Sequence, residues 1–489
     1  MIKISNLKYV IAFLIPIFMV VMLAGCLNND SWFVLSEGRQ IVEHGIYYTD
    51  ELSMHSDFQV TVQNYGFAVI FWLIYSATGI VGLYVGMLAM FGLILWLLYK
   101  ICMLISNKNV NLSLMLMMVT GVVMSFGFIV TRGQIVSYAI LLGVIYALEL
   151  FIKTDKVKYL AWLPVLSLAA INLRASVWWM IFLVIMAYLV DAIRKPKWHL
   201  QGYRWKPIVG ATLVSLVVGL INPYGIKMIT FVFTSYGVAE ISNLVNEMHP
   251  FNPMSGVELI FYLAIVSVII SYVFGKGKNV RVRYLLLFFG FLMLGLSSVK
   301  VMGELILVMF FPLAFLYKSW KMPRVIEDVK IWWMMVSWMG IATVCLTVGA
   351  ASGTLYFLED APSQAMAEAM DVIDAKVEEN SLEKKELKIY VGYNNGGYVE
   401  FRGYKAFLDP RAEVFIKKNN GVADLLKEWE EFVEGKERIE EFLEKYNFDY
   451  LVVDNVSDWQ IYEMENNGYA VLYEDSEEEI KVLERVRDE

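Results

Sequence analysis

Apolar residues dominate the chain up to about residue 350, where they recur in blocks separated by short polar segments. Blocks of roughly 15 to 25 residues are long enough, as α-helices, to cross the hydrocarbon core of a bilayer. Hydropathy along the chain places such spans at 9–27, 80–104, 112–130, 135–152, 158–172, 175–193, 207–222, 257–274, 283–297, 301–318 and 331–350. The pattern predicts an α-helical polytopic membrane protein with about 11 spans.

A shorter apolar run, Gly66–Ser76, precedes the second of these spans, and Gly79 separates the two. The run is too short to cross a bilayer as a helix. We interpret it as a helix that lies in, or dips into, the outer interface.

The pattern changes after residue 350, where polar residues interrupt the apolar ones every few positions. Helical periodicity predicts helices near 362–379, 421–433 and 436–446. Alternating runs predict strands at 387–393, 405–408 and 450–454 and a closing pair within 469–484, and Gly396-Gly397 is typical of a turn. We therefore expect a transmembrane domain over 1–350, with an outer loop at 28–65, and a small α/β domain over 351–489.

Composition supports this division. The chain is 58% hydrophobic and only 18% charged, with a mean hydropathy of +0.54, which excludes an ordinary soluble protein. The first 350 residues carry an excess of Lys and Arg, whereas the remainder is acidic enough to bring the net charge to −8. Because the C-terminal domain is acidic, we expect no nucleic-acid partner.

Basic residues also predict the sidedness of the membrane domain. With the N-terminus in the cytoplasm, the inner segments contain twenty Lys and Arg residues, and the outer segments contain five: Arg39, Arg132, Arg174, Lys227 and Lys300. An excess of this kind marks the cytoplasmic side of membrane proteins. We expect a multi-pass cell-membrane protein with a cytoplasmic N-terminus and an extracytoplasmic C-terminal domain.

The segment Leu23-Ala24-Gly25-Cys26 allows two interpretations. It has the form of a bacterial lipobox, in which Cys26 would be lipidated after cleavage of a signal peptide. It also fits the outer end of a retained first helix, and the ten further spans favour this second interpretation. The three cysteines, Cys26, Cys102 and Cys345, have no metal-ligand spacing, so no zinc site or disulfide framework is indicated.

The first outer loop carries the most chemically suitable carboxylates. Trp32, Leu35, Ile41 and Val42 predict an amphipathic helix over 31–44 on the bilayer surface, with Ser31 at its start, Asp30 just before it and Gly45 after its end. Asp30, Asp50 and Glu51 bracket this helix, and a carboxylate there can act as a general base for a hydroxyl or an amine. The alternative is that Asp30 is a helix cap and Asp50-Glu51 a solvated turn.

Two arginines, Arg132 and Arg174, stand at outer ends of predicted spans. A guanidinium there suits a phosphate ligand, although each side chain alternatively reaches the lipid headgroups. The outer segment Asn222-Pro223-Tyr224-Gly225 starts a loop long enough to fold over a cavity. Lys300 and Glu304 are spaced as an ion pair on one helix face, and Asp409-Pro410-Arg411 forms a second possible pair.

Other classes of membrane protein fit less well. The spans lack a row of acidic or histidine residues suited to proton relay, and no inverted repeat of the transporter type is evident. The short cytoplasmic loops contain no phosphate-binding loop of the Walker type. A lipid-linked donor reached from the outer side therefore fits better than a soluble nucleotide donor.

Several segments, in order, resemble those of bacterial polytopic glycosyltransferases of the GT-C class, such as protein O-mannosyltransferases and lipid A aminoarabinose transferases. They are D-S-W-F-V-L-S-E-G-R-Q-I-V-E-H-G-I-Y-Y-T-D-E-L-S from Asp30, R-G-Q-I-V-S-Y from Arg132, L-P-V-L-S-L-A-A-I-N-L-R from Leu163, G-L-I-N-P-Y-G from Gly219 and Y-N-N-G-G-Y-V-E-F-R-G-Y-K-A-F-L-D-P-R from Tyr393. The resemblance covers most of the chain, and the order of the motifs carries it.

The resemblance implies an enzyme that moves a sugar from a polyprenyl-phosphate donor to an extracytoplasmic acceptor, which is a glycan, a lipid or a protein. Asp30 would be the catalytic base and Asp50 a second acid of the loop. Arg132 and Arg174 would hold the phosphate, and the remaining expected substrate-binding residues are Glu51, Asn64 and Tyr224. The expected partners are this donor, the acceptor and membrane lipids. No cofactor is evident, and a divalent metal stays possible.

The sequence departs from the family pattern at two places. Gln63-Asn64-Tyr65 stands where relatives often have His-Glu-Trp or Gln-Glu-Trp, and Asn172-Leu173-Arg174 stands where they often have Asn-Leu-His. These departures favour an alternative, a non-catalytic protein of the same fold that binds or handles lipid-linked glycans.

Overall fold

The computed structural model describes residues 4–23, 27–193, 202–235, 241, 248–252, 258–274, 280–319, 362–435, 438–454, 456–475 and 480–486. Cys26, the predicted span 331–350 and the predicted boundary at 350/351 lie outside these residues. The chain forms two compact units: the first contains Met1–Gly25, Leu83–Ile229 and Val245–Leu358, and the second contains Cys26–Gly82, Thr230–Leu244 and Glu359–Glu489.

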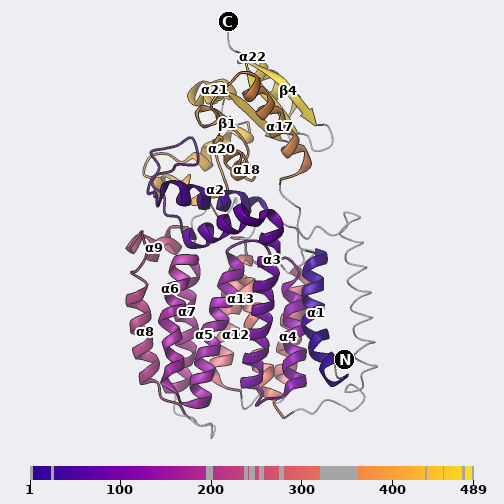
Figure 1. Cartoon of the computed structure of the whole chain (residues 1–489), viewed down its shortest axis with the longest axis vertical. Helices are drawn as coiled ribbons and strands as arrows, with labels where there is room; N and C mark the ends of the chain where they lie inside the picture. Colours follow the sequence, from indigo (N-terminus) through magenta and orange to yellow (C-terminus); the bar gives the residue numbers. More distant parts are fainter. Residues whose placement is uncertain are drawn as a thin grey trace. The chain divides into compact units, whose positions relative to one another are not determined.

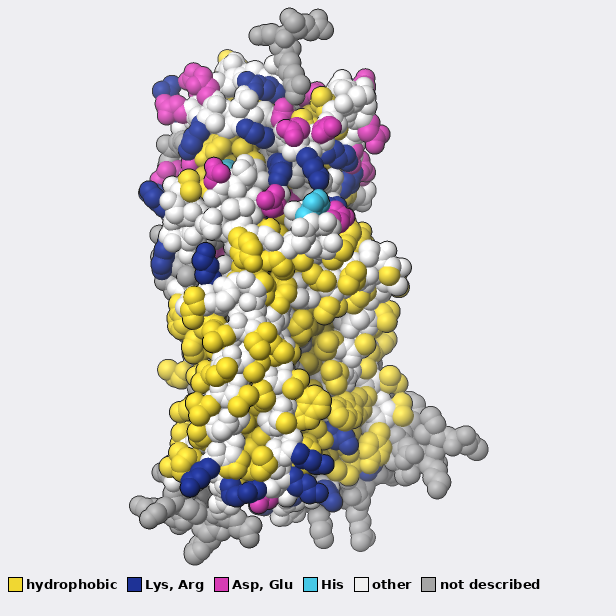
Figure 2. All heavy atoms as spheres, turned by 60° about the vertical axis from the view of Figure 1, so that its left-hand side comes forward, with side chains coloured by type: hydrophobic (Ala, Val, Ile, Leu, Met, Phe, Trp, Pro, Cys, Tyr) yellow, Lys and Arg dark blue, Asp and Glu magenta, His cyan; other side chains and the backbone are white. Residues whose placement is uncertain are grey.

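The first unit is built from apolar helices, and most of the predicted spans are found in it (Figure 1). They are α1 (Ile4–Leu23), α4 (Val110–Met124), α5 (Gln134–Thr154), α6 (Trp162–Leu173) with a preceding 3-10 turn, α7 (Ala175–Ile193), α8 (Lys206–Val218), α11 (Glu258–Phe274) and α12 (Val282–Ser297). Among the described residues, four helical segments are long and apolar enough to cross a membrane: Tyr65–Ile105, Gln134–Thr154, Ala175–Ile193 and Val299–Leu316. Shorter apolar helices accompany them. Figure 2 shows apolar side chains over these helices.

Three helical segments differ from the predicted pattern. The helix α3 (Tyr65–Ile105) joins the predicted interface helix and the next span, and Gly79, with φ 66° and ψ −160°, breaks the helical geometry between them. The predicted span 301–318 is divided into α13 (Met302–Val308) and α14 (Phe311–Leu316), with Pro312 in the first turn of the second piece. A further helix, α9 (Ile226–Ser235), follows Tyr224 where the sequence predicted a loop.

Close helix packing in the first unit depends on small residues. A Cβ atom on Gly121 would meet the ring of Pro16, and one on Gly219 would meet the indole of Trp178. The Trp178 indole donates a hydrogen bond to Ser167 Oγ at 2.7 Å, and this hydroxyl donates to the Ser215 carbonyl at 2.8 Å. These contacts connect α6, α7 and α8 through small residues and buried hydrogen bonds, as is usual for helices packed in a membrane.

A buried ionic network connects α5, α7 and α12. Arg283 Nε lies 3.0 Å from Glu149 Oε1, and Arg283 Nη1 lies 2.9 Å from Asp191 Oδ2. The hydroxyls of Tyr188 and Tyr284 donate to the same Glu149 oxygen at 2.9 and 3.0 Å. Because charges inside a membrane are costly unless they are paired, this network fixes the relative positions of three helices.

The second unit contains a five-stranded mixed sheet in the order β2-β1-β3-β5-β4. Its strands are β1 (Lys388–Tyr390), β2 (Lys405–Ala406), β3 (Tyr450–Asp454), β4 (Tyr469–Asp475) and β5 (Ile480–Arg485). β1 pairs in parallel with β2 and β3, whereas β5 pairs antiparallel with β3 and β4. Phe407, Phe442 and Phe448 are fully buried beside the sheet and form the centre of an aromatic core.

The helices of this unit include the predicted amphipathic ones: α17 (Gln364–Glu379), α20 (Leu425–Val433) and α21 (Ile439–Tyr446). Two short helices, α19 (Lys417–Asn420) and α22 (Asp458–Asn466), were not predicted. The expectation of a turn at Gly396-Gly397 is wrong, because these residues begin the helix α18 (Gly396–Phe401).

The first outer loop belongs to the second unit rather than to the helical one. Its helix, α2 (Asn29–His44), packs against α18 (Figure 1). The following segment lies along the edge strand β2, where Met54 N donates to the Ala406 carbonyl at 3.0 Å. Lys405 Nζ donates to the Glu51 carbonyl at 2.5 Å, and His55 Nε2 lies 2.9 Å from the Phe407 carbonyl oxygen. The edge of the sheet is thereby covered by a segment more than 300 residues away in sequence.

Candidate functional site

The start of α2 is fixed by a capping box. Asn28 is the N-cap, its Oδ1 accepts from the Ser31 backbone N–H at 3.1 Å, and Ser31 Oγ accepts from the Asn28 N–H at 3.2 Å. The helix therefore begins at Asn29, and Asp30 lies inside its first turn. The sequence had predicted that Asp30 precedes the helix. A carboxylate in a first helical turn is stabilised by the helix dipole.

Asp30 is partly exposed and lies near Tyr393, which follows β1. Burial, and then the negative charge of Asp30, raise the pKa of the Tyr393 hydroxyl well above its usual range. That hydroxyl donates to the Pro410 carbonyl at 2.8 Å. Tyr393 thus connects the predicted catalytic carboxylate with the loop that carries Asp409 and Arg411.

The helix α2 packs closely on α18 through glycine. A Cβ atom on Gly397 would lie 2.9 Å from the Phe33 backbone nitrogen, closer than a side chain tolerates. Trp32 contacts Tyr398 and Phe401 with ring centroids 5.0 and 4.7 Å apart. Arg39 donates from its two terminal nitrogens to the carbonyls at the end of α18, each at 3.1 Å.

Two of the resemblance motifs therefore pack on each other. The segments starting at Asp30 and at Tyr393 supply α2 and α18, respectively, and meet in one interface. The predicted apolar face of α2 is confirmed at Trp32, Leu35 and Ile41, which are buried, whereas Val42 is 45% exposed and was assigned wrongly. The sequence predicted that this face of the helix lies on the bilayer surface. In the structure its buried residues pack against other parts of the protein.

Asp50 is fully buried beside Arg411. Arg411 Nη1 lies 3.0 Å from Asp50 Oδ1, and Asp50 Oδ2 accepts from the Ser53 hydroxyl and backbone N–H. Although burial alone would raise it, the pKa of Asp50 is lowered by the Arg411 guanidinium and by these hydrogen bonds. The alternative of a solvated turn at Asp50-Glu51 is thus wrong for Asp50, whereas the Glu51 side chain is exposed.

Arg411 is shared by further carboxylates. It lies 2.6 Å from Asp409 and 3.5 Å from Glu400, the former being the ion pair that the sequence suggested. Burial, followed by the negative charge of Asp409, raises the pKa of Glu400 well above its usual range. Glu37, on α2, is 2% exposed, and burial raises its pKa to about 8. We call Glu37, Asp50, Glu400, Asp409 and Arg411 the buried acidic cluster.

The buried acidic cluster contains more carboxyl groups than counter-charges. Its four carboxylates face one guanidinium, so ionising all of them would leave uncompensated negative charge in a dry interior. Burial accordingly raises the pKa of Glu37 and of Glu400, while Asp50 and Asp409 pair with Arg411. The cluster thereby connects α2 and α18 with the loop that contains Asp50 and the loop that contains Asp409 and Arg411.

Asn64, the last expected residue of this unit, directly precedes α3. Its carbonyl accepts from the Ala68 N–H at 2.9 Å, so the residue starts that helix, and its side chain is partly exposed. The structure therefore places Asp30 near Tyr393 and Asp50 against Arg411, whereas the Glu51 side chain is exposed and that of Asn64 is partly exposed.

The remaining three expected residues lie in the first unit. Arg174 ends α6, and its Nε donates to Ser176 Oγ at 3.3 Å. Glu304 on α13 is 5% exposed, and the positive charges acting on it come first from Arg174 and then from Lys300. The sequence had paired Glu304 with Lys300 alone. Gln134 donates to the Lys300 carbonyl at 3.1 Å, which brings the start of α5, two residues after Arg132, to the same end of the helices.

Tyr224 lies in a turn tied to this end. Asn222 Oδ1 accepts from the Tyr224 N–H at 3.0 Å, and Asn172 Nδ2 donates to the Ile221 carbonyl at 3.0 Å. Gly225 has a φ of 58°, a left-handed conformation that glycine adopts without strain. These hydrogen bonds connect the turn that contains Tyr224 to the end of α6, the helix that Arg174 follows.

Sequence reasoning missed Glu37, Glu400 and Tyr393 as members of this arrangement. A period-3.6 pattern shows which helix face is buried, but a glutamate on that face looks like an error in the pattern rather than a signal. No group of three or more His, Cys, Asp or Glu residues is arranged to hold a metal ion within the described part of the chain.

The fold is similar to those of solved membrane-enzyme structures. It aligns with the archaeal oligosaccharyltransferase AglB from Archaeoglobus fulgidus, in complex with an inhibitory peptide and a dolichol-phosphate, with a TM-score of 0.60 and 10% identity over 97% of this chain and 73% of that one. The chain has a GT-C-like fold. The expectation drawn from the order of the motifs is thereby confirmed for the fold.

Two further alignments agree with the GT-C-like assignment. The apo form of the A. fulgidus oligosaccharyltransferase gives a TM-score of 0.53 with 12% identity over 95% of this chain and 71% of that one. ArnT from Cupriavidus metallidurans, in the apo state, gives 0.51 with 11% identity over 98% and 97% of the two chains. Neither a known protein family nor a curated protein matches the sequence itself.

Proposed function

We propose that this protein is a membrane glycosyltransferase that moves a sugar from a polyprenyl-phosphate donor to an extracytoplasmic acceptor. The observation that carries the proposal is the GT-C-like fold, which spans nearly the whole of this chain and of ArnT. The AglB structure that it resembles contains a dolichol-phosphate, a lipid of the same chemical class as the proposed donor. Because one fold can support several chemistries, the roles of single residues are proposed from their own chemistry and position.

Asp30 is the proposed catalytic base. Its carboxylate would accept the proton of the acceptor hydroxyl or amine. At the same time the acceptor oxygen or nitrogen would form a bond to the anomeric carbon of the donor sugar. The bond between this carbon and the phosphate oxygen breaks, and the polyprenyl phosphate leaves with the electron pair. The position of Asp30 in a capped first turn, partly exposed, supports this role.

Arg132 and Arg174 are the proposed phosphate ligands, and Tyr224 is a proposed substrate contact. Guanidinium groups would stabilise the charge that develops on the leaving phosphate. Glu51 and Asn64, at the surface of the second unit, are proposed substrate contacts. We assign Asp50 a structural role instead, because its carboxylate is fully buried and bound to Arg411.

The proposed location is the cell membrane, with a cytoplasmic N-terminus, a transmembrane part within 1–350 and an extracytoplasmic part within 351–489. Hydrogen bonds between segments that were predicted to share a side support this location. On the inner side they connect Lys8 with Asn111, Lys153 with Asn107, and Asn109 with the Lys318 carbonyl. On the outer side the Val299 N–H donates to the His249 carbonyl at 3.1 Å.

The central test is Asp30→Asn in the full-length protein. We expect loss of sugar transfer from a polyprenyl-phosphate donor, with unchanged membrane insertion and thermal unfolding, because asparagine keeps the shape but is not a base. Glu43→Gln, an exposed acid on the same helix, is the matched control and should transfer normally. Normal transfer by Asp30→Asn would refute the assignment of the base.

A second candidate function is a non-catalytic protein that binds lipid-linked glycans. Asn64 favours it, because an amide stands where the family pattern often has a carboxylate. In that case the purified protein would bind a polyprenyl-phosphate lipid without turnover, and Asp30→Asn would leave binding unchanged. Surface-glycan mass spectrometry of cells with and without the protein separates the two functions.

A further inference from the structure

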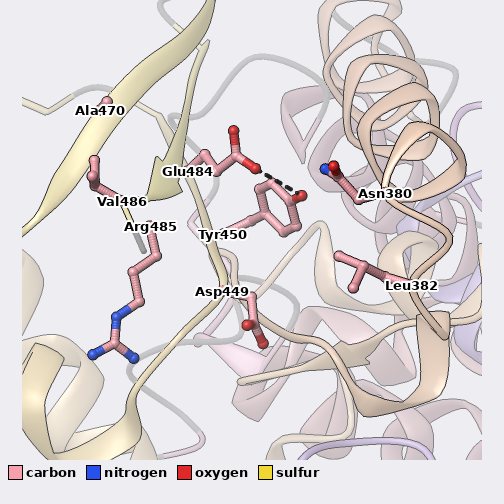
Figure 3. Close-up of a pocket in the computed structure, with 8 residues that line it drawn as sticks. All are labelled: Asn380, Leu382, Asp449, Tyr450, Ala470, Glu484, Arg485 and Val486. Carbon is pink, nitrogen blue, oxygen red and sulfur yellow. Dashed lines mark hydrogen bonds between the residues drawn. The ribbon is translucent and has the colours of Figure 1, made fainter. Parts of the chain in front are cut away.

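The second unit contains a pocket that the proposed transfer reaction does not use. Its volume is about 450 Å³, and it is lined by Asn380, Leu382, Asp449, Tyr450, Ala470, Glu484, Arg485 and Val486 (Figure 3). A volume of about 300 to 1,000 Å³ is usual for small-ligand pockets. The lining residues come from the end of α17, the start of β3, the start of β4 and the end of β5.

The register of the sheet builds one wall of the pocket. Tyr450 pairs with Glu484 between β3 and β5, and Glu484 pairs with Ala470 between β5 and β4. Residues paired in this way lie in a row on one face of the sheet. The opposite wall is formed by Asn380 and Leu382, where the Leu382 N–H donates back to the Val377 carbonyl at 3.0 Å and thereby ends α17.

The polar groups of the pocket are held in place by the protein. The Tyr450 hydroxyl donates to Glu484 Oε1 at 3.3 Å, and Asp449 Oδ2 accepts from the Lys388 N–H at 2.9 Å. In Figure 3 the Asn380 amide and the Glu484 carboxylate approach Tyr450 from the two walls. Groups that are already oriented lose less entropy when a ligand binds.

The lining selects among ligand classes. Two carboxylates against one guanidinium disfavour a phosphate or another anion. A wholly apolar ligand would remove water from these groups without replacing their hydrogen bonds. A neutral polyhydroxylated ligand satisfies both requirements, because each hydroxyl is a donor and an acceptor. Leu382, Ala470 and Val486 supply apolar surface for the carbon–hydrogen faces of a sugar ring.

We propose that this pocket binds a short neutral glycan segment and so gives the C-terminal unit a glycan-binding site separate from the proposed transfer site. The site does not depend on Asp30 or on turnover. It would hold envelope glycan against the second unit whether that glycan is an acceptor or a free chain end.

The test uses the full-length protein in lipid nanodiscs, which avoids detergents with sugar headgroups. Saturation-transfer NMR with cellobiose, lactose and N,N′-diacetylchitobiose should give transfer to ring protons of at least one sugar. Asn380→Ala and Glu484→Ala each remove a hydrogen-bonding group from one wall and should weaken binding about tenfold. Glu465→Ala, an exposed acid on α22 of the same unit, is the control and should bind as the wild type.

A further variant distinguishes a loss of binding from a loss of folding. Ala470→Trp fills the pocket from an exposed position and leaves Asn380 and Glu484 intact, so it should abolish binding without altering thermal unfolding. Asp30→Asn should bind normally, which separates this proposal from the proposed function. Equal binding by wild type and Ala470→Trp, the absence of transfer to every sugar, or tighter binding of glucose 6-phosphate than of the neutral sugars would each overturn it.

Discussion

Arg411 shows how one residue can hold distant parts of the chain. It is 3% exposed and lies within ion-pair distance of Asp50 in the first outer loop, Glu400 on α18 and Asp409 beside it. A planar guanidinium can face several carboxylates at once, which the single ammonium of lysine cannot do with the same geometry. The sequence motif Asp-Pro-Arg is therefore a structural junction.

Replacing this cation should destabilise the second unit. We expect Arg411→Met to lower the free energy of unfolding by about 3–5 kcal/mol, because the buried carboxylates lose their counter-charge. Limited proteolysis and thermal unfolding of the purified protein measure the change. Arg438→Met, whose side chain is 70% exposed, should change stability by less than about 0.5 kcal/mol. Similar effects for the two variants would contradict the structural role of Arg411.

The buried acidic cluster also predicts a pH dependence of stability. Burial raises the pKa of Glu37 from 4.5 to about 8, so between these values the folded protein keeps a proton that the unfolded chain has released. The contribution of Glu37 to stability is therefore greatest below about pH 4.5 and falls as the pH rises to about 8. Asp50, with a lowered pKa, acts in the opposite direction and only at acidic pH.

Glu37→Gln tests this dependence, because glutamine mimics the protonated acid and does not titrate. The unfolding temperature of the wild type should fall between about pH 5 and 8, and that of Glu37→Gln should fall less steeply. Differential scanning fluorimetry at a series of pH values gives both slopes. Parallel slopes would show that Glu37 is ionised at neutral pH. Glu43→Gln, on the exposed face of α2, should follow the wild type.

At the level of elements, the packing of α2 on α18 places the proposed base. Asp30 lies at the start of one helix, and Gly397 allows the other helix to approach the Phe33 backbone. Trp32 and Arg39 then fix the two helices along their length. The position of Asp30 thus depends on a glycine that lies more than 360 residues later in the chain.

A methyl group at Gly397 should disturb this interface. Gly397→Ala places a carbon 2.9 Å from the Phe33 nitrogen, and we expect a loss of about 1–3 kcal/mol in stability together with reduced transfer. Gly392→Ala is the matched control, because its new carbon would lie 3.7 Å from Asp454, an ordinary contact. Thermal unfolding and transfer activity measure both. Equal behaviour of the two variants would argue against a close α2–α18 contact.

The elements also show the limits of sequence patterns. Long apolar runs gave α5, α7 and α12 almost to the residue, because burial or lipid on all sides demands apolar side chains throughout. Gly396-Gly397 was misassigned as a turn, since a glycine needed for close packing and a glycine needed for a turn look the same in the sequence. The helix α9 was missed because its ten residues follow a Pro-Gly turn signal.

On the scale of the whole molecule, the alternation of inner and outer loops predicts its orientation. Segments assigned to the same side by their Lys and Arg content are joined by hydrogen bonds in the first unit, as between Lys153 and Asn107. Figure 2 shows basic side chains gathered at one end of the apolar helices. Such clustering is typical of the cytoplasmic end.

Cysteine labelling in intact cells tests the orientation. In a variant without the three native cysteines, Glu465→Cys in the second unit should react with a membrane-impermeant maleimide, whereas Lys156→Cys between α5 and α6 should react only after lysis. Both positions are exposed in the structure, so burial does not limit the reaction. The reverse pattern would invert the proposed topology.

The sequence by itself determined the membrane class, the span positions within the described helices and the order of motifs that indicated a GT-C-like fold. These features are local, because helix length and hydropathy depend on neighbouring residues. Only the tertiary structure decided that the first outer loop joins the C-terminal unit, that Asp50 is buried on Arg411 and that burial raises the pKa of Glu37. Such features arise from contacts between segments hundreds of residues apart, and burial and charge at those contacts have no signature within a single segment.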